Sequence, residues 1–260
     1  MSKIRFFSAL FVILSVNLFG QDTNDSKESP FSFGSDFVNR YIWRGVNLGD
    51  NTPSIQPSMS LSFGSEKHAF SLGTFGAYSM GGQHLQEGDL ILSYTFNEIL
   101  TLSVTDYFFP SDNIVGSNKY FNYDKDKTGH VFESALSFNG TEKIPFSLMF
   151  AMNFYGADAR KINADGSDAG IFMSKYVEIG YTKEFKNMSM NLFVGGTIDD
   201  PDETKGEMGF YGNQSYGVIN LGCKLTKEVK ITENFSLPLQ SQIIINPEQE
   251  RIFLVFGFSL

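Results

Sequence analysis

The last ten residues of the chain, 251–260, carry a large apolar side chain at every second position. The even-numbered positions are Ile252, Leu254, Phe256, Phe258 and Leu260, whereas the odd-numbered positions end in the small residues Gly257 and Ser259. A period of two predicts a β-strand with one apolar face. An unpaired apolar strand at the edge of a sheet promotes aggregation, so this strand needs a partner. The chain end therefore predicts a sheet that closes on itself.

The N-terminus has the pattern of an export signal. Lys3 and Arg5 precede an apolar run over 6–16, which at about 11 residues is too short to span a bilayer. Gly20 precedes the expected cleavage point, and no later segment is apolar for 18 uninterrupted residues. We predict a signal peptide over 1–20, a flexible segment over 21–29 and an outer-membrane barrel over 30–260.

Alternating segments fill the rest of the chain, and their connections alternate in length. The expected strands are about 30–44, 53–63, 68–79, 87–97, 99–109, 130–139, 145–156, 174–185, 188–198, 214–226, 231–245 and 250–260. Connections after the second, fourth, sixth, eighth and tenth segments are short, and those after the third, fifth, seventh and ninth are longer. This predicts an all-β fold, an antiparallel transmembrane β-barrel of about 12 strands with short periplasmic turns and longer external loops.

The same alternation also fits a soluble β-sandwich, in which the apolar side chains would face a core. The export signal, the sorting of loop lengths and the terminal strand together favour the barrel. In a barrel the apolar face contacts lipid and the polar face lines the lumen.

Charged residues in the first segment share one face. Asp36, Arg40 and Arg44 have the same parity, and Phe37, Tyr41 and Trp43 have the opposite one. An Arg facing lipid near the midplane would cost about 2–4 kcal/mol, so the charged face is assigned to the lumen. The lumen-lining candidates are Asp36, Arg40, Arg44, Glu133, Glu178 and Glu184. They either form an electrostatic constriction or pair with one another and fill the interior.

The segment 34–57 reads GSDFVNRYIWRGVNLGDNTPSIQP and resembles the N-terminal hairpin of the TorF-like outer-membrane porin family of Gram-negative bacteria. The matching residues are Ser35, Asp36, Phe37, Arg44, Gly45, Pro53 and Gln56. The segment 251–260 resembles the closing strand that the barrel-assembly machinery recognises, although Leu260 stands where Phe is usual. The resemblance implies a channel-like outer-membrane barrel without a defined cargo.

Enzymatic chemistry has little support in the sequence. The histidines are His68, His84 and His130, and His130 alone is expected near the external rim where a lipid-cleaving barrel needs a His–Ser pair. No metal-ligand spacing, phosphate-binding loop or cysteine pair occurs, so we predict no cofactor, no metal and no enzyme activity. The formal net charge of −9 gives no indication of nucleic-acid binding.

We expect a porin-like passive diffusion channel for small polar solutes in the cell outer membrane, with both termini periplasmic. The expected partners are outer-membrane lipid and lipopolysaccharide, the barrel-assembly machinery during biogenesis, and the solutes. One alternative is a non-conducting structural or surface-binding barrel, whose lumen is sealed by side chains or by the 110–129 loop. The other is a lipid-modifying barrel enzyme.

Overall fold

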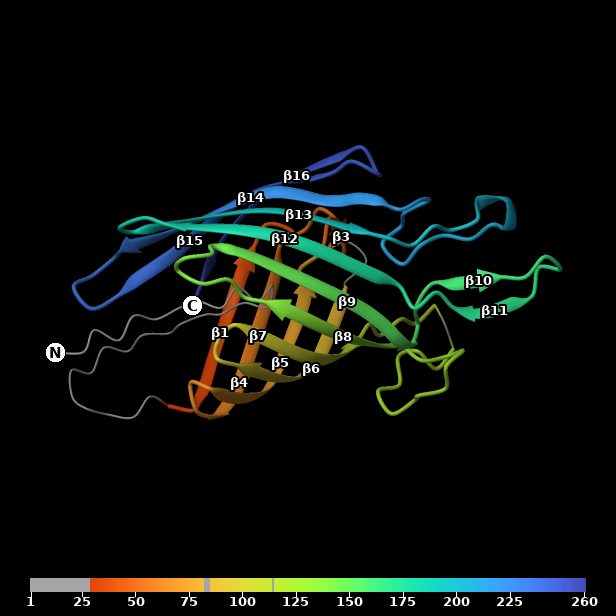
Figure 1. Cartoon of the computed structure of the whole chain (residues 1–260), viewed down its shortest axis with the longest axis horizontal. Helices are drawn as coiled ribbons and strands as arrows, with labels where there is room; N and C mark the ends of the chain where they lie inside the picture. The colour runs from red at the N-terminus through yellow and green to blue at the C-terminus, as the bar shows by residue number, and fades with distance from the viewer. Residues whose placement is uncertain (1–28, 82–84, 114) are drawn as a thin grey trace.

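The computed structural model describes residues 29–81, 85–113 and 115–260, so the predicted signal peptide and most of the segment 21–29 lie outside the described residues. Twelve antiparallel strands close into one barrel in the order β1-β16-β15-β14-β13-β12-β9-β8-β7-β6-β5-β4, which confirms the predicted fold class (Figure 1). These strands are β1 (Phe31–Val38), β4 (Ser54–Gly64), β5 (His68–Ser79), β6 (Gln86–Phe96), β7 (Leu100–Phe108), β8 (His130–Phe138), β9 (Phe146–Gly156), β12 (Lys175–Glu184), β13 (Met188–Thr197), β14 (Gly217–Lys230), β15 (Ser236–Asn246) and β16 (Arg251–Ser259).

The barrel closes between its first and last strands. Phe37 of β1 lies opposite Phe258 of β16, and their rings stack with centroids 5.0 Å apart. Ser35 and Leu260 exchange both backbone hydrogen bonds at 3.0 Å. The C-terminal strand is therefore paired on both sides, with β15 and β1, and leaves no open edge.

The outer wall of the barrel is apolar, whereas the inner wall is small or polar apart from buried apolar clusters such as that of Phe193 and Phe253. Leu72 and Leu92 face each other across β5 and β6 and are both exposed on the outside. Their neighbours Ser71 and Ser93 face each other on the opposite, inner side. Such a wall requires a lipid environment around it, because a continuous apolar belt in water would aggregate. None of the helical segments in the described residues is long and apolar enough to cross a membrane.

The longest connections lie at one end of the barrel, as predicted, although 80–85 and 247–250 at that end are short. We call one end the turn end, where the strands are joined by 65–67, 97–99, 139–145, 185–187 and 231–235. At the other end, the loop end, the connections are 39–53, 80–85, 109–129, 157–174, 198–216 and 247–250. A hairpin of β10 (Arg160–Ile162) and β11 (Asp168–Ile171) projects beyond the barrel there (Figure 1). The 198–216 loop contains a short 3-10 helix, η1 (Glu203–Lys205).

Three predicted boundaries are wrong: the end of β1, the end of β14 and the start of β15, which begins at Ser236 and not at residue 231. β14 continues to Lys230, so its turn is 231–235, because the antiparallel pairing with β15 extends through the charged residues at its end. β1 ends at Val38 and does not reach residue 44. The side chain of Asn39 ends the strand, since it donates to the carbonyl of Leu254 and accepts from the amide of Phe256. The chain then turns into the barrel.

Candidate functional site

A small hairpin lies inside the barrel at its loop end. It consists of β2 (Ile42–Trp43) and β3 (Val46–Asn47), and we call residues 41–48 the lumen hairpin. Its turn residues Arg44 and Gly45 both have positive φ, 49° and 79°, as a two-residue type I′ turn requires. At its base, the Leu48 amide donates to the Tyr41 carbonyl at 3.1 Å. The 39–53 connection between β1 and β4 is thus folded inward.

The tip of the lumen hairpin touches the far wall of the barrel. A Cβ atom built on Gly45 would lie 1.8 Å from the carbonyl oxygen of Ile219 in β14. The side-chain amide of Asn246, at the end of β15, donates to the Gly45 carbonyl at 3.1 Å. Only glycine fits this contact, and the hairpin therefore crosses the lumen from β1 and β4 to β14 and β15.

Arg44 anchors the tip by an ion pair in the barrel interior. Both terminal guanidinium nitrogens donate to the Glu133 carboxylate of β8, Nη2 at 2.9 Å. Nη1 also donates to the hydroxyl of Tyr211 at 3.0 Å. The guanidinium lies 4.7 Å from the ring centre of Trp43 and 4.6 Å from that of Tyr176. A buried arginine needs this combination of a bidentate carboxylate and aromatic faces to replace its hydration.

Tyrosine side chains complete the network around the ion pair. The Tyr107 hydroxyl donates to Glu133 at 3.1 Å, and burial raises the pKa of Tyr211, which therefore keeps its proton. A second carboxylate, Glu178, accepts hydrogen bonds from Tyr176 and from the Asn220 amide. Trp43 packs edge-on against Tyr107 with ring centres 5.5 Å apart. The lumen hairpin is thus held by aromatic contacts as well as by charge.

The three charged residues that the sequence placed together in the first strand lie in different parts of the structure. Asp36 is buried and accepts hydrogen bonds from Ser259 and Gln240, so it belongs to the closing seam and not to the Arg44 network. Arg40 is half-buried and makes no ion pair with any described residue. Arg44 lies in the hairpin turn, whereas the sequence analysis had placed it in the wall. Tyr41 and Trp43, assigned there to the lipid face, are inside for the same reason.

The three acidic residues that were predicted to line the lumen wall also differ in position. Glu133 and Glu178 lie in the loop half of the lumen, and both are buried. Glu184, at the turn end of β12, is exposed and has no role in the network. Sequence reasoning missed Tyr107 and Tyr176 as members of the site. Both have the parity of polar inner positions, which is the signal that would have found them.

Inward-facing side chains are more exposed near the turn end of the barrel than near its loop end. On β4, Ser62 is exposed and Ser60 half-buried, whereas Gln56 is buried. On β12, Thr182 is half-buried and Tyr176 is fully covered. On β7 even Thr101 at the turn end is covered, since Asn139 donates to its hydroxyl. The lumen hairpin and its partners fill the loop half, and much of the turn half remains accessible.

The 110–129 loop, one of the two ways in which the lumen was expected to be sealed, packs against the outside of the barrel. Its Tyr120 and Tyr123 pack on the ring of His130, which is fully buried. His130 Nδ1 lies 2.7 Å from a carboxylate oxygen of Asp106, and Nε2 lies 2.6 Å from the Tyr120 carbonyl. No serine hydroxyl of the described residues hydrogen-bonds to this ring, so the geometry supplies no nucleophile–base pair.

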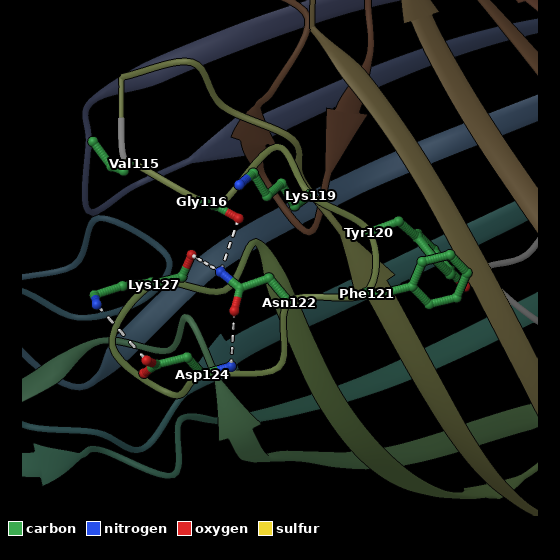
Figure 2. A pocket seen from close by; sticks show the side chains of 8 residues that line it. All are labelled: Val115, Gly116, Lys119, Tyr120, Phe121, Asn122, Asp124 and Lys127. Carbon is green, nitrogen blue, oxygen red and sulfur yellow. Dashed lines mark hydrogen bonds and ion pairs between the residues drawn. The ribbon is translucent and has the colours of Figure 1, made fainter.

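An open surface pocket lies within the same loop, lined by Val115, Gly116, Lys119, Tyr120, Phe121, Asn122, Asp124 and Lys127. Figure 2 shows that Asn122 spans it, donating to the carbonyls of Gly116 and Lys127. The pocket belongs to the loop surface and is separate from the lumen. Within 29–81, 85–113 and 115–260, no group of three or more His, Cys, Asp or Glu side chains is arranged to hold a metal ion.

Three solved structures resemble the chain over most of its length. A NanC porin has a TM-score of 0.42 and 7% identity, covering 88% of this chain and 98% of that one. The β domain of the Bordetella autotransporter BrkA has a TM-score of 0.38 and 8% identity, covering 89% and 98%. Salmonella typhi OmpF in complex with daunomycin has a TM-score of 0.37 and 6% identity, covering 88% and 96%. Neither a protein-family model nor a curated protein matches the sequence.

Proposed function

We propose that this protein is a narrow porin-like channel for small polar solutes in the outer membrane, and that the lumen hairpin is its constriction. The observation that supports the proposal is the lining of the lumen. Its turn half is lined by small polar side chains such as Ser60 and Thr182, and its loop half is narrowed by one defined hairpin. An interior of small polar groups suits hydrated solutes, whereas a barrel that serves only as an anchor has no need of one.

The proposal includes an orientation. The turn end would face the periplasm, so that both termini and the short turns lie there and the projecting β10–β11 hairpin lies outside. The segment that resembles TorF-like porins, 34–57, contains β1, the lumen hairpin and the start of β4. We propose membership of that family on this resemblance.

The same hairpin favours a second function. Its tip contacts the Ile219 carbonyl across the lumen, as a permanent plug would. A plugged barrel would act through its external loops, and it would pass no solute.

A liposome-swelling assay with purified protein separates the two functions. As a narrow channel, the protein is expected to admit glycine and arabinose and to exclude the trisaccharide raffinose. Empty liposomes and liposomes with heat-denatured protein are the controls. Swelling with none of the solutes, together with no ion current in planar bilayers at any voltage, would establish the plugged barrel instead.

A further inference from the structure

Two acidic side chains inside the barrel have no cationic partner among the described residues. Glu87 and Asp89 lie two residues apart on β6 and so share one face of the strand. That face is the inner one, because the alternating residues Leu90 and Leu92 are exposed on the outside. Glu87 is 7% exposed and Asp89 is 4% exposed. Both Glu87 carboxylate oxygens and Asp89 Oδ1 lack a well-formed hydrogen bond to the described residues, although the two carboxyl groups lie near each other and near the Tyr41 hydroxyl.

Neutral polar groups without partners gather on the neighbouring strands. The hydroxyls of Ser54 and Ser79 are each about 1% exposed, lie opposite each other on β4 and β5, and make no hydrogen bond to described residues. The Nε2 atom of Gln56 is likewise buried and unpartnered. Ala77 of β5 lies directly opposite Glu87. The β4–β6 wall therefore carries several buried polar atoms without partners among the described residues, near its loop end.

The base of the lumen hairpin covers this part of the wall. Tyr41 packs on Phe75, which lies opposite Asp89 on the neighbouring strand. Burial raises the pKa of Tyr41, and the nearby carboxylates of Glu87 and Asp89 raise it further. A Cβ atom built on Gly49 would lie 2.9 Å from the Ser79 hydroxyl and 3.1 Å from Tyr41 Cβ. The polar atoms are thus enclosed between the hairpin and the wall.

Buried polar groups in proteins are almost always satisfied by protein, by water or by a bound ion. Two buried carboxylates on one face repel each other, and hydroxyl groups beside them do not neutralise that charge. The described residues supply no counter-charge, so either protons or a bound cation must neutralise the pair. A hard cation fits the chemistry, since all the surrounding candidate ligands are oxygens and two carboxylates match a divalent charge.

We propose that Glu87 and Asp89 bind one divalent hard cation of the Ca²⁺ class inside the barrel, with the hydroxyl of Tyr41 and with water completing its oxygen shell. The site goes beyond the proposed function, because it exists whether or not the barrel conducts. It couples the hairpin base to the β6 wall, as the Arg44–Glu133 pair couples the hairpin tip to β8.

Terbium luminescence tests the site, because Tb³⁺ replaces Ca²⁺ and nearby aromatic rings sensitise its emission. The full chain in nanodiscs would be titrated with TbCl₃ and then with CaCl₂. We expect a saturable emission component of one Tb³⁺ per barrel that Ca²⁺ displaces. The double variant Glu87→Gln, Asp89→Asn should lose this component. The matched control Asp200→Asn, Glu203→Gln removes two exposed carboxylates of the 198–216 loop and should keep it.

Thermal unfolding provides a second measurement that does not depend on the probe. Addition of CaCl₂ to chelator-treated protein should raise the Tm of the wild type and of the loop control but not of the lumen double variant. The double variant itself should fold, since it removes two unpaired buried charges. Retention of the displaceable emission or of the Ca²⁺-dependent Tm shift in the lumen variant would overturn the proposal. So would their absence in the wild type, which would mean that the carboxylates are neutralised by protons.

Discussion

Excision of the lumen hairpin is expected to increase the single-channel conductance of the barrel severalfold. Tyr41 and Leu48 are already hydrogen-bonded at the hairpin base, so replacement of residues 42–47 by Gly-Gly joins them without moving either wall strand. The excision removes Trp43 and Arg44 from the loop half of the lumen, and side chains that fill it now would then face water. Conductance in planar bilayers measures the effect, and raffinose should become permeant in the swelling assay.

The control for this excision is a variant in which a hairpin outside the barrel is shortened. Shortening the β10–β11 hairpin removes a projecting part of the 157–174 loop and should leave conductance unchanged. An excised barrel that conducts no better than the wild type would show that the lumen hairpin is not the constriction.

Replacement of Arg44 by methionine is expected to be the most destabilising single substitution in the lumen, by about 3–5 kcal/mol. Methionine fills much of the same space, but it leaves the Glu133 carboxylate buried without its cation. Urea unfolding in detergent micelles, followed by the different gel mobilities of folded and unfolded barrels, measures the loss. The ion pair itself, rather than packing, is the expected cause.

Two further variants isolate that cause. Arg40→Met removes an arginine that has no ion pair with the described residues, and it should cost no more than about 1 kcal/mol. The double variant Arg44→Met, Glu133→Gln should recover part of the stability, because no bare carboxylate then remains buried. Equal losses for Arg44→Met and Arg40→Met would contradict the role assigned to the pair.

The wall of the barrel could be predicted from the sequence because each wall residue faces either lipid or the lumen. That constraint acts at every position, so the alternation of side chains marks the strands, and β5 was predicted with its observed bounds of 68–79. The alternation also predicts that Glu87 and Asp89, the residues of the proposed cation site, face the lumen, since both have the inner parity of β6. The inner parity of Glu133 and Glu178 led to their prediction as lumen residues, whereas Glu87 and Asp89 were not among the predicted residues.

The lumen hairpin could not be predicted in this way. Tyr41 and Trp43 have the same parity as Phe37, so the apolar alternation resumes after Asn39 even though the chain has left the wall. The local signal was Arg44-Gly45 between Ile42-Trp43 and Val46-Asn47, which fits a type I′ turn as well as a loop. The pairing of Arg44 with Glu133 joins residues 89 positions apart and depends on how the hairpin crosses the lumen. Strand periodicity carries no information about that crossing.

The most direct test of the filled loop half is cysteine accessibility along the lumen. Cys223, the single native cysteine, would first be replaced by serine. The substitution Ser60→Cys places a thiol in the accessible half of β4. The substitution Ala151→Cys places one on β9, in the buried cluster against which Trp43 and Val46 pack. In nanodiscs, which leave both ends of the barrel open to solvent, the rate of reaction with a charged maleimide is the measurement.

We predict rapid labelling of Ser60→Cys and slow labelling of Ala151→Cys in the intact protein, and rapid labelling of both after the hairpin is excised. Equal rates at the two positions in the intact protein would contradict the account, because they would mean that the hairpin does not occupy the lumen.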